Sequence, residues 1–191
     1  MKYFILLLLL SGCDYQPKSD PQSLYNEEFK WTITIPEDFQ LVNATDWAKI
    51  QNKGANAIED TFGEEVENQA KLIFVFKNAE HNYLEANQQP FDEAIDGDYL
   101  DSFRNVNEII HETFRTQLPN AEMQTHESEE SISGLQFHTN KTILKFANGK
   151  VLHMLMFSRL FDKQEFTVNI MYIDQDQGKK MLDAWKNSQF D

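Results

Sequence analysis

Cysteine is almost absent from this chain, since Cys13 is the only one among 191 residues. A single thiol forms no intramolecular disulfide. The fold must therefore be held together by packing. The chain is long enough for one domain with a hydrophobic core, and its fifteen phenylalanines argue against disorder.

Basic residues are few as well. Lys and Arg number 17 against 31 Asp and Glu, which gives a formal net charge of −14. Loss of residues 1–12 would remove Lys2 and make the charge one unit more negative. A field of this sign repels the phosphates of nucleic acids and the headgroups of anionic lipids. The composition therefore excludes nucleic acid as a partner.

The N-terminal apolar run is too short to cross a membrane. Tyr3–Leu10 has eight residues, whereas a spanning helix needs about 20. Lys2 precedes the run, and the small residues Ser11 and Gly12 follow it. This pattern is typical of a secretory signal peptide, which we place at residues 1–12.

The motif Leu10-Ser11-Gly12-Cys13 resembles the lipobox of bacterial lipoproteins. The resemblance implies cleavage before Cys13, a diacylglyceryl thioether on its sulfur and acylation of the new N-terminus. Two or more acyl chains hold a protein stably on a bilayer. We therefore expect a lipid-anchored protein of the bacterial cell envelope. The motif does not decide between the inner and the outer membrane. The alternative is an ordinary signal peptide with a chance cysteine.

The sequence after the anchor divides into a tether and one domain. Residues 13–28 contain Pro17 and Pro21 and show no periodic apolar pattern, which predicts a lipidated cysteine followed by a flexible linker. Residues 29–191 are predicted to form a single globular domain. An extended tether would hold this acidic domain away from the lipid surface.

Apolar periodicity predicts the elements of the domain. Strands are expected at 29–36, 39–42, 70–77, 121–132, 135–146, 151–161 and 166–173, and helices at 45–62, 98–118 and 174–185. Residues 82–91 are predicted to form either a weaker, polar strand or a loop. Region 45–62 is predicted to form two short helices interrupted at Gly54, and the continuous apolar run 70–77 to form a central strand. The apolar stripe of the 98–118 helix consists of Tyr99, Phe103, Val106, Ile110, Phe114 and Leu118.

The dipeptide Asn148-Gly149 predicts a type I′ hairpin turn between strands 135–146 and 151–161. A two-residue turn fixes the register, so that the numbers of paired residues sum to 297. The predicted pairs include Leu144 with His153 and His138 with Arg159. The two histidines would then lie on one face of the hairpin, too far apart to bind one metal ion.

Several weak motifs follow one another along the domain. They are Trp31-x-Ile33-x-Ile35-Pro36-x-x-Phe39, a long middle helix, Gly134 before a three-stranded meander, and Trp185-x-x-Ser188-x-Phe190. Over about residues 29–190 this order resembles the Mog1/PsbP-like family. The resemblance implies an α+β fold, an α-β-α sandwich with helices on both faces of a largely antiparallel sheet. It also implies a function in binding partners, because the family shares no catalytic residues.

Two motifs come close to metal sites. His111-Glu112-x-x-Arg115 departs from the zinc motif H-E-x-x-H at its last position, where a guanidinium repels a cation. Glu108 and His111 have the spacing of half a di-metal site, but the second pair is missing. We expect Glu108, His111 and Glu112 to form a solvated helix face. Asp174 and Asp176 lack calcium-loop spacing and are predicted to cap the last helix. No metal or cofactor is expected.

The chain contains no G-x-S-x-G motif, no phosphate-binding glycine loop and no cysteine nucleophile. We therefore expect a non-enzymatic, membrane-anchored binding or accessory protein whose partner is a protein. The candidate partner surface is the acidic edge strand with Glu127, Glu129 and Glu130.

Two alternatives remain open for the function. A basic toxin as partner would make the protein an immunity or inhibitor lipoprotein, since its surface is acidic. A metal-dependent hydrolase would instead use the helix face with Glu108, His111 and Glu112.

Overall fold

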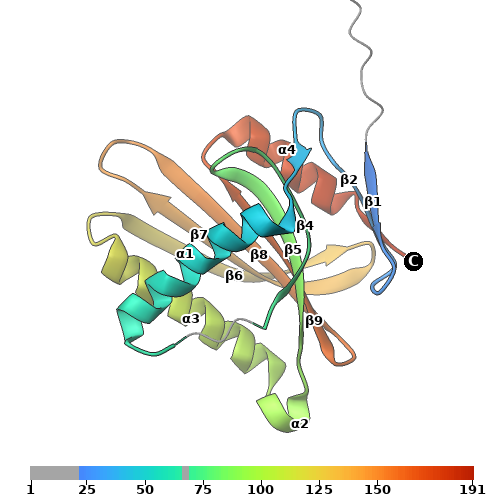
Figure 1. Cartoon of the computed structure of the whole chain (residues 1–191), viewed down its shortest axis with the longest axis horizontal. Helices are drawn as coiled ribbons and strands as arrows, with labels where there is room; N and C mark the ends of the chain where they lie inside the picture. Colours follow the sequence, from blue (N-terminus) through green and yellow to red (C-terminus); the bar gives the residue numbers. More distant parts are fainter. Residues whose placement is uncertain (1–21, 66–68) are drawn as a thin grey trace, which may run out of the picture.

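The computed structural model describes residues 22–65 and 69–191. The predicted signal peptide, Cys13 and residues 14–21 of the predicted tether lie outside the described residues. A seven-stranded antiparallel sheet forms the centre of the domain (Figure 1). Its strands are β3 (Gln40–Leu41), β4 (Lys71–Ala79), β5 (Asn82–Pro90), β6 (Glu122–Ile132), β7 (Leu135–Lys145), β8 (Val151–Phe161) and β9 (Gln164–Tyr172). They lie in the order β3-β4-β5-β9-β8-β7-β6.

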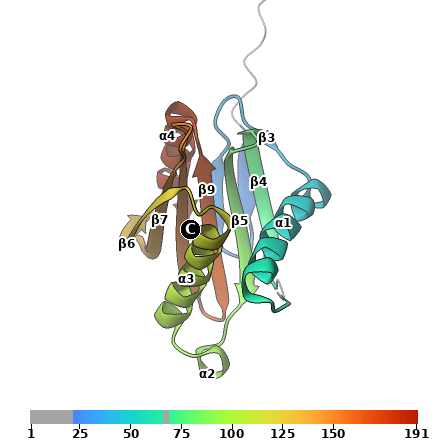
Figure 2. The same ribbon diagram turned by 90° about the vertical axis from the view of Figure 1, so that its left-hand side faces the viewer.

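Both faces of this sheet are covered. Helices α1 (Ala44–Phe62) and α3 (Tyr99–Gln117) cover one face, and the short α2 (Glu93–Asp96) precedes α3. The other face carries α4 (Gln175–Lys186) and a small sheet of β1 (Ser23–Asn26), β2 (Trp31–Thr34) and β10 (Gln189–Phe190). Figure 2 shows the strands between α4 and α1. The predicted α+β sandwich is confirmed, with a small sheet completing the α4 layer.

An aromatic core fills the space between the large sheet and the α4 layer. Trp31 and Trp185 are fully buried, and their rings meet edge to face at 5.8 Å. Phe166 of β9 packs against both rings. The predicted alternation of the first strand is confirmed, because Phe29, Trp31, Ile33 and Ile35 are all buried. Aromatic pairs of this geometry contribute about 0.5–1.5 kcal/mol each beyond their buried area.

The prediction of a tether through residue 28 is wrong at its C-terminal end. Ser23–Asn26 forms β1 and pairs antiparallel with β2, from Ser23 with Thr34 to Asn26 with Trp31. Among these four residues only Leu24 packs against the core, and Tyr25 is exposed. Backbone hydrogen bonds to β2 therefore hold a strand that has no apolar alternation.

Region 45–62 forms one helix, contrary to the prediction of two. Asn43 caps α1 by accepting a hydrogen bond from the Asp46 N–H, and Gly63 ends it in a left-handed conformation. Gly54 lies in the helix interior without breaking it. A helical glycine costs only about 1 kcal/mol relative to alanine, and burial of Trp47 in the same helix offsets such a cost.

Strand β4 is not central, although its apolar run predicted so. It is second from the edge, and the edge strand β3 pairs with only two of its residues, Lys77 and Phe76. Segment 39–42 thus supplies a partner of β4 rather than of the first strand. The run is apolar because helix α1 contacts β4 on one face and aromatic rings pack on the other, as Phe39 does on Phe76. A continuous apolar pattern therefore reports two covered faces, not a central position.

The turn between β7 and β8 has three residues, so the predicted type I′ turn is wrong. The Gly149 N–H donates to the Phe146 carbonyl and the Phe146 N–H to the Lys150 carbonyl. Gly149 has φ +82°, whereas Asn148 has no positive φ. This is a type I turn followed by a left-handed glycine.

The longer turn shifts the register by one residue. Paired numbers sum to 296, as in Leu144 with Leu152 and His138 with Ser158. A one-residue shift moves side chains to the opposite face. His138 therefore lies near Tyr99 of α3, while His153 stacks on Tyr172 on the other face.

Candidate functional site

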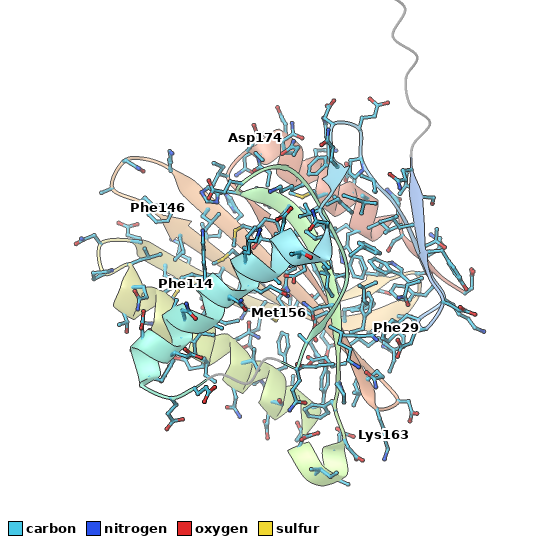
Figure 3. All side chains as sticks on the ribbon, in the orientation of Figure 1. Phe29, Phe114, Phe146, Met156, Lys163 and Asp174 are labelled. Carbon is cyan, nitrogen blue, oxygen red and sulfur yellow. The ribbon has the colours of Figure 1, made fainter. Side chains whose placement is uncertain are left out.

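A pocket of about 320 Å³ lies between α1, α3 and the face of strands β5, β7, β8 and β9 that these helices cover. We call it the α1–α3 pocket. Figure 3 labels Met156, one of its lining residues, near the middle of the sheet. Ligand pockets begin at about this size, and they combine apolar walls with a few polar groups.

The pocket floor consists of two rows of side chains that cross the sheet. Strand pairing places the first row as Glu85, Asn169, Met156 and Asn140, and the second as Tyr83, Met171, Met154 and Thr142. All eight residues line the pocket. Each row joins β5, β9, β8 and β7, because directly opposed residues of paired strands point to the same face. A polar group thus stands at each end of the first row, with Asn169 and Met156 between them.

Glu85 is buried at the β5 end, with 7% of its surface exposed. Its Oε1 accepts hydrogen bonds from Trp47 Nε1 at 2.7 Å and from Gln51 Nε2 at 2.8 Å, both on α1. Burial raises the pKa of Glu85, while the bonds from Trp47, Asn169, Gln51 and Asn87 oppose that rise. All four of these donors are neutral side chains.

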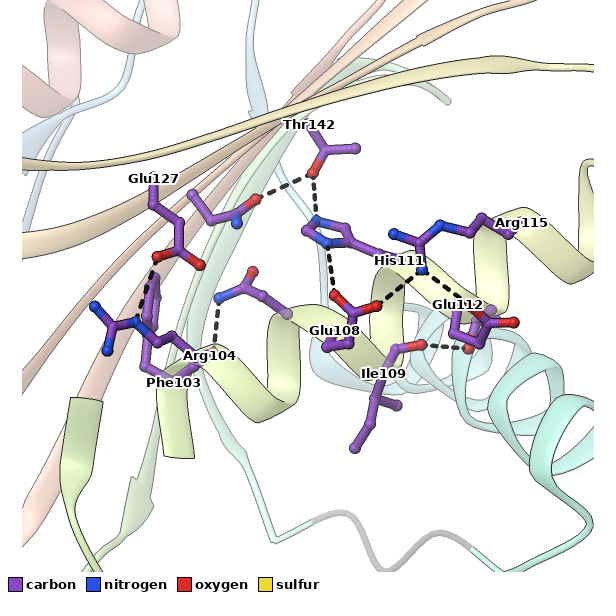
Figure 4. Close-up of polar contacts among 12 residues, drawn as sticks. Phe103, Arg104, Glu108, Ile109, His111, Glu112, Arg115, Glu127 and Thr142 are labelled. Carbon is purple, nitrogen blue, oxygen red and sulfur yellow. Dashed lines mark hydrogen bonds and ion pairs between the residues drawn. The ribbon is translucent and has the colours of Figure 1, made fainter. Parts of the chain in front are cut away.

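The β7 end of the floor holds an amide with a free donor. Asn140 is 3% exposed, and its Nδ2 has no hydrogen-bond partner among the described residues. Its Oδ1 accepts from Thr142 Oγ1 at 3.1 Å, and Thr142 Oγ1 lies 3.0 Å from His111 Nε2 (Figure 4). Because the Thr142 hydroxyl donates to Asn140, the His111 Nε2–H donates to Thr142. This chain of bonds fixes the Asn140 amide in the pocket wall.

The structure corrects the predicted face of α3. His111 was expected in solvent but is 6% exposed, and Asn107 is buried beside it. Val106, expected in the apolar stripe, is 41% exposed. The reason is that α3 packs over the polar pocket floor, so polar side chains point inward and an apolar one points outward. Periodicity of hydrophobicity alone cannot locate the buried face of such a helix.

The other metal-like residues of α3 form ion pairs on the surface. Arg115 Nη1 donates to Glu108 Oε1 and to Glu112 Oε2, each at 2.9 Å (Figure 4). The Arg115 guanidinium lowers the pKa of Glu108. Among the described residues, no group of three His, Asp or Glu side chains is placed to hold a metal ion.

Strand β6 is an edge strand, as predicted, but its glutamates do not share one surface. Glu127 lies 3.5 Å from Arg104 of α3, whereas Glu130 lies 3.1 Å from Lys186 of α4, on the other side of the sheet. Glu129 lies 3.4 Å from His138. The alternation of a strand separates Glu130 from Glu127 and Glu129. Only these last two face the layer that contains the pocket.

A second polar cluster joins α3 to the sheet. Ser158 Oγ donates to Glu165 Oε1 at 2.7 Å and lies 2.7 Å from the Tyr99 hydroxyl. Burial raises the pKa of Tyr99. Although Ser158 is paired with His138 across the strands, it is fully buried. A nucleophile must reach its substrate, so this serine has a structural role.

Comparison with known proteins gives one kind of match. Neither a protein-family model nor a curated protein matches the sequence. Among solved structures, the chain is similar to the solution structure of cyanobacterial PsbP (CyanoP) from Synechocystis sp. PCC 6803, with a TM-score of 0.56 and 13% identity. The match covers 95% of this chain and 99% of the CyanoP chain. The chain has the PsbP-like fold. The fold implied by the family resemblance is thereby confirmed, and at this identity the likeness concerns the fold alone.

Proposed function

We propose that this protein is a non-enzymatic binding protein of the bacterial cell envelope, anchored by lipid at Cys13, which holds a group of a protein partner in the α1–α3 pocket. The observation that carries the proposal is the composition of the pocket floor. It offers a buried carboxyl at Glu85, an unpaired amide donor at Asn140 and a methionine between them. The carboxyl and the amide can form hydrogen bonds with a bound group, and the flexible thioether side chain of methionine adapts to its shape.

Gly54 supports a binding role, because no packing contact requires a glycine there. A Cβ at this position would meet no atom within 4 Å, and glycine costs a helix about 1 kcal/mol relative to alanine. Gly54 also lines the pocket. Its missing side chain leaves the α1 side of the pocket open.

Catalysis fits the same geometry less well. Thr142 and His111 resemble a nucleophile and its base, but the Thr142 hydroxyl donates to Asn140 rather than to the histidine. His111 Nδ1 lies 3.9 Å from Glu108, beyond hydrogen-bond distance, and Arg115 already holds that carboxylate. A catalytic triad needs a base that accepts a hydrogen bond from the hydroxyl of the nucleophile and that is held in place by a third group.

The acidic edge beside the pocket suits a basic partner. Glu127 is paired with Asn140 across the strands, so it continues the first row of the floor. The chain carries a formal net charge of −14, and a field of this kind speeds association with cations and is screened by salt. Reversing the charge of Glu127 and Glu129, the two glutamates of β6 that face the pocket layer, should therefore slow association, most strongly at low ionic strength, whereas reversal of Glu130 on the other side of the sheet should not. Binding that ignores both salt and reversal would contradict this part.

Photocrosslinking from the pocket tests the proposal on the full chain in its native membranes. A photoreactive aliphatic residue of similar size replaces Ile110, which lines the pocket from α3, and a control replaces Lys179 on α4, whose side chain is 76% exposed on the opposite side of the sheet. We expect a discrete protein adduct from position 110 and none from position 179. Equal adducts at both positions, or none at 110, would refute the pocket as the binding site.

A further inference from the structure

The α1–α3 pocket contains a buried carboxyl whose hydrogen-bond donors are all neutral side chains. Glu85 is almost fully buried, and its four partners on α1, β5 and β9 supply hydrogen bonds but no positive charge. A buried carboxylate is stabilised best by a cation within hydrogen-bond distance. A bound cationic group would supply a positive charge next to Glu85.

At the opposite end of the first row, Asn140 can donate a further hydrogen bond to an acceptor. Asn140 Nδ2 is a buried donor without a partner among the described residues, and an unpaired buried donor costs about 1–3 kcal/mol. An oxygen atom of a ligand would satisfy it. Between the two ends, Asn169 stands next to Glu85, and Met156 together with Met154 and Met171 of the second row presents thioether and methylene surface.

The spacing of the strands sets the length of the ligand. Neighbouring strands lie about 4.8 Å apart, so the three steps from β5 to β7 separate the backbones of Glu85 and Asn140 by roughly 14 Å. Two hydrogen bonds of about 2.9 Å each leave roughly 8 Å between the polar ends of a ligand. A lysine residue has this form, since the four-carbon stem of its side chain and its Cα separate the ammonium from the residue's own carbonyl.

We propose that the α1–α3 pocket binds an alkylammonium group on an apolar stem, with the ammonium at Glu85, the stem along Met156 and a carbonyl oxygen at Asn140. The ligand is a lysine side chain of a protein partner. This assignment rests on the proposed function, and it adds the chemistry that the pocket recognises. A free alkyl diamine carries the same ammonium and stem but lacks the carbonyl.

Methionine methyl NMR of the mature protein in detergent tests the assignment, because it detects weak binding at single residues. The probe is Nα-acetyl-lysine N-methylamide, and its matched control is the norleucine analogue, which lacks only the ammonium. We expect the lysine probe to shift the methyl signals of Met154, Met156 and Met171. Met181 lies fully buried in the α4 layer and should not respond. The norleucine analogue should bind at least tenfold more weakly, a difference of about 1.4 kcal/mol.

Two variants separate the ends of the ligand. Glu85→Gln keeps an oxygen that can accept from Trp47 and Gln51, so the fold should persist while the preference for lysine over norleucine disappears. Asn140→Leu should weaken both probes by a similar factor. Equal binding of the two probes to the unchanged protein, or an undiminished lysine preference in Glu85→Gln, would overturn the assignment.

Free 1,5-diaminopentane distinguishes the two sources of the ammonium. Weaker binding of the diamine than of the capped lysine supports a partner side chain, and tighter binding overturns that source. The outcome for the proposed function is separate. A crosslink from position 110 without any response to lysine refutes the ligand class alone, whereas a lysine response without a crosslink refutes the protein partner.

Discussion

Replacing His111 with alanine is the sharpest test of the structural basis of the pocket. The sequence places His111 beside Glu108 and Glu112 on a solvated helix face, where a substitution changes stability by about 0.5 kcal/mol or less. The structure buries the imidazole to 6% exposure and bonds its Nε2 to Thr142. The two accounts therefore predict different stabilities.

The magnitude follows from what His111→Ala removes. Loss of the imidazole takes the donor from Thr142, which is itself buried, and a buried polar group left unsatisfied costs about 1–3 kcal/mol. The space left by the ring adds a packing loss, and water entering from the pocket offsets part of both. We expect a net destabilisation of about 2 kcal/mol.

Urea denaturation followed by circular dichroism measures this difference. The matched control is Asn105→Ala, an exposed position on the same helix, which should change the free energy of unfolding by less than about 0.5 kcal/mol. A loss of about 2 kcal/mol corresponds to roughly 4–8 °C in the melting temperature of a domain of this size. If His111→Ala matches the control, the imidazole is not a buried part of the pocket wall.

Three further changes have defined outcomes. Burial raises the pKa of Glu85, so the folded state binds the proton of this carboxyl more tightly than the unfolded state does. The contribution of the protonated carboxyl to the free energy of unfolding is therefore present below the unfolded pKa and is lost as pH rises through the folded pKa. The free energy of unfolding of Glu85→Gln should lack this decline with pH. Gly149→Val should cost at least about 1 kcal/mol at φ +82°, because a β-branched residue is strained there, and Gly149→Asn should cost less in the same denaturation assay. Cys13→Ser should abolish labelling by a fatty-acid analogue and release the protein from membranes, and persistent labelling would sink the lipoprotein hypothesis.

The sequence predicted the parts of the fold that depend on one repeated local signal. Strict alternation located the buried side of Trp31 and Ile33, and the helix at 98–118 was predicted to within one residue of α3 at each end. The hairpin of β7 and β8 was predicted, but its register was wrong by one residue. Asn148-Gly149 is compatible with a two-residue and with a three-residue turn, and only the backbone geometry decides between them. Strand β1 was not predicted, because its few apolar residues show no periodic pattern and backbone hydrogen bonds to β2 hold it in place.

The pocket could not be read from the sequence for a different reason. Glu85 lies in a segment whose polarity suggests a loop, yet it is buried because Trp47 and Gln51, 38 and 34 positions away, donate to it. Asn140 and Met156 come together only through strand register, and a one-residue shift would place them on opposite sides of the sheet. Pairing between distant strands therefore decides the site, and no single stretch of residues encodes it.

Crosslinking yield from position 110 in native membranes, compared between the otherwise unchanged chain and Glu85→Gln, tests the central claim most directly. We expect a discrete partner adduct whose yield falls about tenfold when the buried carboxyl becomes an amide. The amount of the variant on the membrane should be unchanged, and its melting temperature at neutral pH should be unchanged or slightly raised. An adduct of equal yield in both chains would show that the partner is held by surface outside the α1–α3 pocket.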